Sequence, residues 1–144
     1  MLKVDNLCAY YGESIILKDV SLNVEPGSVA CLLGRNGVGK STFLKSVMGL
    51  VKTPKGSVYL DNEDITRLPT YNRARKGIGY VPQGRDIFPQ LTVYENLILG
   101  LERNGYKKGV LTEEVFELFP VLKTMMKRKG GDLSGGQQQQ LAIA

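Results

Sequence analysis

One stretch of nine residues has the residue types and the spacing that bind a polyphosphate. Residues 34–42 run Gly-Arg-Asn-Gly-Val-Gly-Lys-Ser-Thr and fit the pattern G-x-x-x-x-G-K-[ST], with fixed positions at Gly34, Gly39, Lys40 and Ser41. Glycines let a backbone wrap closely enough for several N–H groups to point at phosphate oxygens. Lys40 would add a mobile positive charge, and Ser41 would offer its hydroxyl to a phosphate-bound magnesium ion.

The residues on either side of this stretch decide between a nucleotide site and a glycine-rich turn that fits the pattern by accident. Upstream, residues 29–33 form an unbroken apolar run, which is typical of a strand buried on both faces of a parallel sheet. Downstream, apolar residues recur at helical spacing: Phe43, Leu44, Val47, Met48, Leu50 and Val51. A helix that starts at Lys40 would aim its first N–H groups at the phosphates. Strand, glycine loop and helix together favour the nucleotide site.

A second group with anion-binding chemistry lies about a hundred residues further along the chain. Ser134, Gly135 and Gly136 precede a segment that continues as Gln137 to Ala144. Taken alone, this sequence is a loop that caps a helix, as many surface helices begin. Its functional interpretation is a second phosphate site, because a serine and two glycines at a helix N-terminus leave N–H groups available to an anion.

Two further residues are candidates for contacts with a nucleotide. Gln83 follows residues 78–82, which we predict to be a strand that Pro82 ends, and open α/β sheets bind ligands beyond the carboxyl ends of their strands. Tyr11 belongs to an aromatic pair ahead of Gly12. It is either a platform for an adenine ring or an ordinary cross-strand packing residue, and its position alone does not choose between them.

The elements that must position these residues change in character along the chain. The amino-terminal part predicts strands at 2–7, 16–24 and 57–60, turns at 25–27 and 61–62, and a short helix over 68–76. From Asp86 to Asp132 the pattern becomes helical. A capping box at 92–95 opens a helix to about Leu101, residues 112–114 cap another, and Pro120 should kink or end that one.

Composition excludes several classes of function. The chain of 144 residues is one domain or a piece of a larger one, with a formal charge of +5 from scattered basic residues, so a dedicated nucleic-acid patch is not favoured. It has no histidine, which excludes a histidine base or metal ligand, and we expect Cys8 and Cys31 to be buried thiols. It has no apolar run of about 18 residues and no signal peptide at its start, so we expect a cytosolic location or one on the cytosolic side of a membrane.

Two phosphate-directed loops with a helical segment between them resemble an ATP-binding-cassette (ABC) ATPase, and Leu-Ser-Gly-Gly-Gln at 133–137 matches that family's signature sequence. The resemblance implies that 34–42 is the Walker A loop, Tyr11 the adenine-stacking residue and Gln83 the Q-loop glutamine. Expected catalytic residues are Lys40, Gln83 and Ser134, and expected Mg²⁺ ligands are Ser41 and Gln83. The residues implied to bind ATP are Tyr11, Gly34, Asn36, Gly37, Gly39, Lys40, Ser41, Thr42, Gln83, Ser134, Gly135, Gly136 and Gln137.

The implied fold is α/β: a P-loop NTPase (RecA-like) core with an N-terminal antiparallel β subdomain and an inserted α-helical subdomain. We expect the β subdomain and Walker A core over 1–85, the helical subdomain over 86–132, and the signature with the start of its helix over 133–144. The family's Walker B strand, catalytic glutamate and histidine switch have no match in the sequence. We therefore expect an amino-terminal fragment of an ATPase subunit that would not hydrolyse ATP alone.

Residues that are less diagnostic than the family's defining motifs suggest a subfamily. Residues 32–40, 80–85, 117–120 and 133–144 resemble importer ATPases for branched-chain amino acids, and the four consecutive glutamines resemble the urea-importer version. Implied partners are a second ATPase subunit, integral membrane permease subunits and, through them, a periplasmic or extracellular solute-binding protein, with no nucleic acid. The implied location is peripheral, on the cytoplasmic face of the membrane. The alternative is a non-transport cassette ATPase that acts on nucleic acid or the ribosome, which the basic charge would tolerate.

Overall fold

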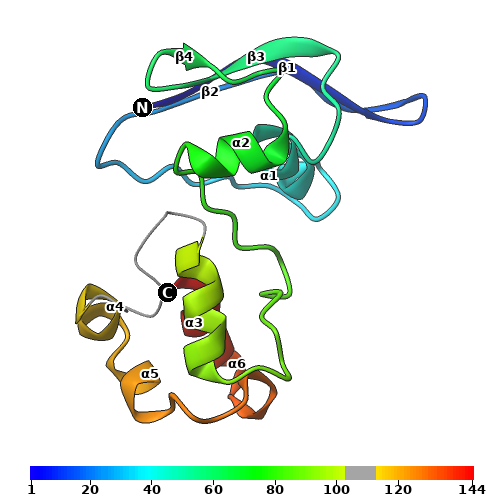
Figure 1. Cartoon of the computed structure of the whole chain (residues 1–144). Helices are drawn as coiled ribbons and strands as arrows, with labels where there is room; N and C mark the ends of the chain where they lie inside the picture. The colour runs from blue at the N-terminus through cyan, green and yellow to red at the C-terminus, as the bar shows by residue number, and fades with distance from the viewer. Residues whose placement is uncertain (103–112) are drawn as a thin grey trace. The chain divides into compact units, whose positions relative to one another are not determined.

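The computed structural model describes residues 1–102 and 113–144, and it divides the chain into two compact units, Met1–Gly79 and Tyr80–Ala144 (Figure 1). We refer to them as unit 1 and unit 2 and describe each by itself. The three-part division expected from the sequence stays a prediction.

Unit 1 is built on a four-stranded antiparallel sheet. Its strands are β1 (Leu2–Tyr11), β2 (Ser14–Val24), β3 (Lys55–Leu60) and β4 (Glu63–Asp64), in the order β2-β1-β3-β4. The three strands predicted from the sequence are present, and each is longer than the prediction. The antiparallel β subdomain that the family resemblance implied is therefore confirmed.

Two helices, α1 (Lys40–Val47) and α2 (Thr70–Arg75), lie on one face of this sheet (Figure 1). The buried core between sheet and helices consists of Val4, Leu7, Ala9, Leu17, Phe43, Val47, Val58 and Ile65. Because α1 contacts both β1 and β2, the position of its first residue is set by packing against the two longest strands.

The buried Arg73 side chain of α2 is hydrogen-bonded to the carboxyl end of α1. Its side chain is only 3% exposed, and its guanidinium donates to the carbonyls of Ser46, Val47, Thr66 and Leu68. Burial lowers the pKa of Arg73, and the charge of Asp64 offsets part of that effect. Since Ser46 and Val47 supply the last carbonyls of α1, Arg73 fixes the carboxyl end of the helix that starts at the phosphate loop.

Two segments predicted to be strands are not strands in the structure. Residues 29–33 and 78–82 have no regular secondary structure, and Val29 and Leu33 are 95% and 88% exposed. Cys31 is also exposed, which corrects the prediction of two buried thiols, whereas Cys8 is buried. The physical reason is that a strand obtains its backbone hydrogen bonds from a neighbour, and in residues 1–102 and 113–144 no strand pairs with either segment. The parallel core expected beside the phosphate loop is therefore not formed by these residues.

Unit 2 is helical, as its sequence predicted. It contains α3 (Val93–Glu102), α4 (Glu113–Leu118), α5 (Pro120–Thr124), the short 3-10 helix η1 (Gly130–Asp132) and α6 (Gly135–Ile143). Its buried core is Val93, Leu97, Leu122, Leu133 and Leu141. Because Leu133 and Leu141 belong to this core, the loop and helix at 134–143 are packed into unit 2.

Local signals in the sequence determine where these helices begin. Thr92 and Glu95 form the predicted capping box: Thr92 N–H donates to Glu95 Oε2 at 2.7 Å, and Glu95 N–H donates to Thr92 Oγ1 at 3.2 Å. The first of these bonds is the main cause that lowers the pKa of Glu95. As predicted, the helix α4 ends just before Pro120, and Pro120 is also the first residue of α5. Thr112, predicted to cap a helix, lies outside the described residues.

Candidate nucleotide-binding site

The phosphate loop has the backbone conformation that its glycines predict. Gly34, Gly37 and Gly39 have φ angles of 153°, 85° and 103°, values that residues with a side chain rarely adopt. At Gly39 a Cβ would also lie 2.9 Å from Leu17 Cδ2 and 3.3 Å from the Ile16 carbonyl oxygen. The end of the loop is therefore held directly against β2, where only glycine fits.

The helix that follows the loop begins with free donors. Gly39 is the N-cap of α1, and within the described chain no side chain caps this end and no acidic residue lies in the first turn. The first backbone bond here runs from Phe43 N–H to Gly39 O at 2.8 Å. The N–H groups of Lys40, Ser41 and Thr42 precede it. Together with the positive end of the helix dipole, they make a site that favours an anion.

Lys40 lies over the loop. Its Nζ donates to the carbonyl oxygens of Gly34 and Arg35, each at 2.7 Å. An ammonium has three donors, so one remains for a ligand while two hold the side chain in place. Asn36, Gly37 and Ser41 are exposed on this loop, and Thr42 is buried beneath it. The structure thus brings together six residues predicted to bind phosphate from 34 to 41, whereas the Thr42 side chain is buried.

The residues present fit a magnesium ion that is held chiefly by a nucleotide. Across residues 1–102 and 113–144 there is no cluster of three or more His, Cys, Asp or Glu that could hold a metal by itself. Ser41 is exposed next to the uncapped helix end, so its hydroxyl is accessible to an ion. Magnesium is commonly bound through one or two protein oxygens plus substrate phosphates and water. Ser41 supplies one such oxygen in unit 1.

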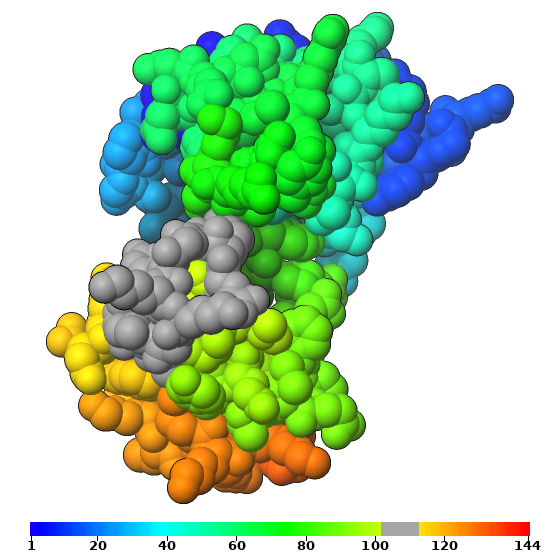
Figure 2. Space-filling view, viewed as in Figure 1, coloured from blue at the N-terminus to red at the C-terminus, as the bar shows by residue number. Residues whose placement is uncertain are grey.

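Tyr11 is the last residue of β1 and pairs with Ser14 across the hairpin turn. The hairpin that joins β1 and β2, blue in Figure 2, protrudes from the rest of unit 1. The Tyr11 side chain is 53% exposed, whereas Leu17 on the paired strand is buried in the core. The structure does not make Tyr11 a core residue, and its role as an adenine platform stays a prediction.

The other predicted site residues belong to unit 2. Ser134 is the N-cap of α6 and forms a capping box: Gln137 N–H donates to Ser134 Oγ at 3.4 Å, and Ser134 N–H donates to Gln137 Oε1 at 2.9 Å. Gly135 and Gly136 form the exposed first turn, which confirms the predicted loop and helix. Gln83 is exposed, in a segment without regular structure.

One residue near these was missed by sequence reasoning. Arg85, two residues after Gln83, donates from Nη1 to Gln138 Oε1 at 3.0 Å. Nothing in the local sequence distinguishes this arginine from the other scattered basic residues, because its partner lies 53 positions away.

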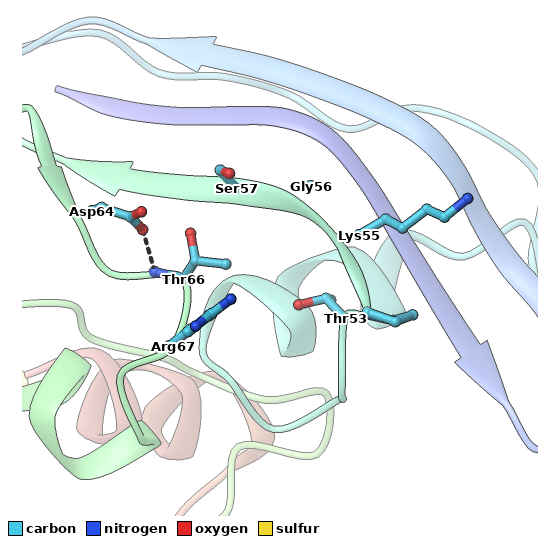
Figure 3. A pocket seen from close by; sticks show the side chains of 8 residues that line it. Thr53, Lys55, Gly56, Ser57, Asp64, Thr66 and Arg67 are labelled. Carbon is cyan, nitrogen blue, oxygen red and sulfur yellow. Dashed lines mark hydrogen bonds between the residues drawn. The ribbon is translucent and has the colours of Figure 1, made fainter.

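A polar cavity of about 430 Å³ in unit 1 is separate from the predicted site (Figure 3). It lies beside β3 and β4, and its lining includes Thr53, Ser57, Asp64 and Arg67. The Asp64 carboxylate accepts a hydrogen bond from Thr66 N–H at 2.8 Å, drawn as a dashed line in Figure 3, and its pKa is lowered by hydrogen bonds from Thr66. No residue that was predicted to bind nucleotide lines this cavity.

Comparison with known proteins adds an independent line of evidence. A family model described as ABC transporter matches residues 17–144. The chain is 41% identical to the high-affinity branched-chain amino acid transport ATP-binding protein BraG of Pseudomonas aeruginosa, over 99% of this chain and 62% of that protein. It is 39% identical to the lipopolysaccharide export system ATP-binding protein LptB of Haemophilus influenzae, over 100% of this chain and 61% of that protein.

Solved structures agree with this result. The chain matches the dimeric structure of MJ0796, a bacterial ABC transporter cassette, with a TM-score of 0.81 and 34% identity, over 99% of this chain and 67% of that one. The chain spans about three fifths of the length of the curated relatives it matches. With the phosphate loop, the Ser134 helix cap and a family match over 17–144, the chain belongs to the ABC transporter family and has the fold of its ATP-binding cassettes.

Proposed function

We propose that this chain is part of an ATPase subunit that binds ATP with Mg²⁺ and uses ATP hydrolysis to drive transport across a membrane. The observation that carries the proposal is the phosphate loop, in which three left-handed glycines, an uncapped helix start and the Lys40 ammonium converge. The N-terminus of α1, which has no side-chain cap and no acidic residue in its first turn, and the Lys40 ammonium are both complementary to a polyphosphate. Membership of the ABC family supports ATP as that polyphosphate.

The candidate site residues have different roles in this proposal. The N–H groups at the start of α1 and the free donor of Lys40 bind phosphate oxygens and orient them. Ser41 and Gln83 would hold Mg²⁺, which neutralises charge on the phosphates when it is bound. The exposed Tyr11 ring would stack on the adenine. Gln83 and Ser134 would complete the set of residues that act on ATP.

We further propose that two subunits enclose ATP between the loop at 34–42 of one and the signature at 134–137 of the other. Lys40 and Ser134 belong to different units of the chain, and each lies at the N-terminus of a helix. The related cassette MJ0796 has a dimeric structure, which supports this arrangement. An ATP molecule that contacts both chains would stabilise the dimer.

Mixed dimers test this arrangement. In complete subunits blocked for hydrolysis, Lys40→Ala and Ser134→Arg are placed either on one chain or on opposite chains of the dimer. If each ATP is shared, both changes on one chain damage both sites, whereas changes on opposite chains damage one site and spare the other. We therefore expect about one ATP retained per dimer in the second case and almost none in the first, measured as nucleotide occluded per dimer. Wild-type dimers, which should retain two, are the control.

The opposite ranking, with more ATP retained when both changes share a chain, would place each site within a single chain. That result would contradict the proposed role of Ser134 but leave the phosphate loop intact.

For the cargo, we propose a branched-chain amino acid or a related small nitrogen compound such as urea. BraG, which is named as a branched-chain amino acid transport protein, supports the first, and the four glutamines at 137–140 support the second. The partners would be membrane permease subunits and, through them, a solute-binding protein, with this subunit on the cytoplasmic face. No helix among the described residues is long and apolar enough to cross a membrane. The nucleic-acid alternative is not favoured, because the relatives named above belong to transport and export systems.

Reconstituted transport tests the cargo. The complete subunit, assembled with its permease in vesicles, should hydrolyse ATP faster when its solute-binding protein carries the cargo. We expect stimulation by leucine, isoleucine or valine if the branched-chain assignment holds, and by urea if the glutamine run is diagnostic. The Lys40→Ala subunit is the control for ATP dependence. Hydrolysis without any response to a loaded binding protein would contradict the transport role.

A further inference from the structure

The segment that follows Gln83 has an unusual backbone. Gly84, Arg85 and Asp86 have φ angles of 104°, 75° and 51°, so three consecutive residues are left-handed. This conformation suits glycine but is unfavourable for the other two, because their Cβ atoms crowd the backbone. A strained backbone persists only where surrounding contacts hold it.

A backbone hydrogen bond of 3.1 Å from Arg85 N–H to the Pro82 carbonyl closes a turn here, and the Arg85 side chain adds contacts to residues far along the chain. Nη1 donates to Gln138 Oε1 at 3.0 Å, and Gln138 Nε2 donates in turn to the Gly130 carbonyl at 3.2 Å. Both ends of the Gln138 amide are therefore used, one by Arg85 and one by η1. Gln138 lies in the first turns of α6, the helix capped by Ser134.

The guanidinium also lies against the start of that helix. A Cβ added to Gly135 would be 3.1 Å from Arg85 Nη2 and 3.6 Å from Arg85 Cζ and Nη1. A side chain at position 135 would therefore have to displace the guanidinium. The absence of a side chain at Gly135 leaves room for the Arg85 guanidinium.

Helix stability does not account for this placement. A positive charge near a helix N-terminus faces the positive end of the helix dipole, which is the unfavourable end for a cation. The chain thus combines a strained backbone at residues 84–86 with a positive charge at the unfavourable end of α6. Together these two features give a direct hydrogen-bonded connection between the segment that carries Gln83 and the helix that begins at Ser134.

We propose that Arg85 is a positioning residue that couples Gln83 to the signature helix. Through Gln138 and Gly135 it holds the N-terminus of α6 at a set place relative to the Gln83 segment, so that movement of one is passed to the other. The inference rests on the proposed function, in which Gln83 and Ser134 both act on ATP. Arg85 acts through Gln138 and Gly135, without a contact of its own to the reacting phosphate.

The test uses the complete subunit assembled with its membrane partner. The variants are Arg85→Met, Gln138→Met, the double variant and Arg85→Lys. Arg128→Met is the matched control, because Arg128 Nη2 also donates one hydrogen bond of 3.0 Å within unit 2, to the carbonyl of Asp132. The measurements are kcat and KM for ATP, the melting temperature, and amide hydrogen exchange at residues 134–137 without nucleotide.

We expect Arg85→Met to lower kcat about fivefold, the effect of losing one hydrogen bond, while KM changes less than about twofold. Gln138→Met should lower kcat at least as much, because it also loses the bond to the Gly130 carbonyl. The double variant should be no slower than Gln138→Met alone, because the two side chains act as a pair. Arg85→Lys should recover part of the rate. Exchange at 134–137 should become about fivefold faster in Arg85→Met and stay unchanged in Arg128→Met.

Two outcomes would overturn the inference: an unchanged kcat in Arg85→Met, whether or not its melting temperature falls, or effects of the two single variants that multiply in the double one. A wild-type subunit without ATP turnover would instead contradict the proposed function. In that case the exchange measurement without nucleotide decides the inference, since unchanged exchange at 134–137 in Arg85→Met would refute it.

Discussion

Lys40→Ala should lower the affinity of the complete subunit for ATP by about 100-fold. At a near-surface effective dielectric, the attraction between the Lys40 ammonium and one phosphate charge at 4 Å is about 4 kcal/mol before desolvation is subtracted. The same substitution removes the bonds from Nζ to the Gly34 and Arg35 carbonyls, which hold the loop closed. A net loss of roughly 3 kcal/mol corresponds to the expected factor. Titration with a fluorescent ATP analogue measures it.

The control for this prediction is Lys45→Ala. Lys45 lies on the same helix, is exposed and belongs to the last turn of α1, far along the helix from the loop. It carries the same charge, so a general effect of removing a lysine from α1 would appear in both variants. Equal losses of affinity in the two would show that the loop geometry does not direct Lys40 at the phosphates.

Arg73→Met should lower the free energy of unfolding of the complete protein by about 3–5 kcal/mol. The substitution keeps an apolar stem but leaves the carbonyls of Ser46, Val47, Thr66 and Leu68 without their donor. Hydrogen bonds to a charged group contribute about 1.5–3 kcal/mol each, and removal of one partner from a buried charged cluster typically costs several kcal/mol. Urea denaturation followed by circular dichroism measures the change.

Two variants sharpen this prediction. Arg75→Met changes an exposed arginine of the same helix whose guanidinium lies 5.8 Å from the Tyr71 ring, and it should cost less than about 1 kcal/mol. Arg73→Lys keeps the charge but cannot reach four carbonyls with a planar fork, so its stability should be intermediate. An unfolding midpoint of Arg73→Met that equals that of Arg75→Met would mean that water replaces the guanidinium at no cost.

Several elements could be predicted from the sequence because neighbouring residues alone specify them. The capping box at Thr92, the helix cap at Ser134, the break at Pro120 and the left-handed glycines of the phosphate loop all depend on residues within a few positions. The strands β1 and β2 were predicted from short-range alternation and β3 from the turn that follows it, and their pairing gives the sheet an apolar face. Membership of the ABC family also followed from two local motifs.

Other features depended on residues distant in sequence, and only the tertiary structure decided them. The apolar run 29–33 is as hydrophobic as a buried strand, but a strand also needs a hydrogen-bonded neighbour, and the described residues supply none, so Val29 and Cys31 are exposed. Arg73 and Arg85 look like ordinary surface arginines in the sequence. Arg73 is buried because the fold places the Ser46 carbonyl, 27 positions away in the sequence, within hydrogen-bond distance of its guanidinium. Arg85 contacts α6 because the fold places the Gln138 amide, 53 positions away, within hydrogen-bond distance. Periodicity and motif spacing report contacts within one element, whereas packing between elements chooses the partners of a long charged side chain.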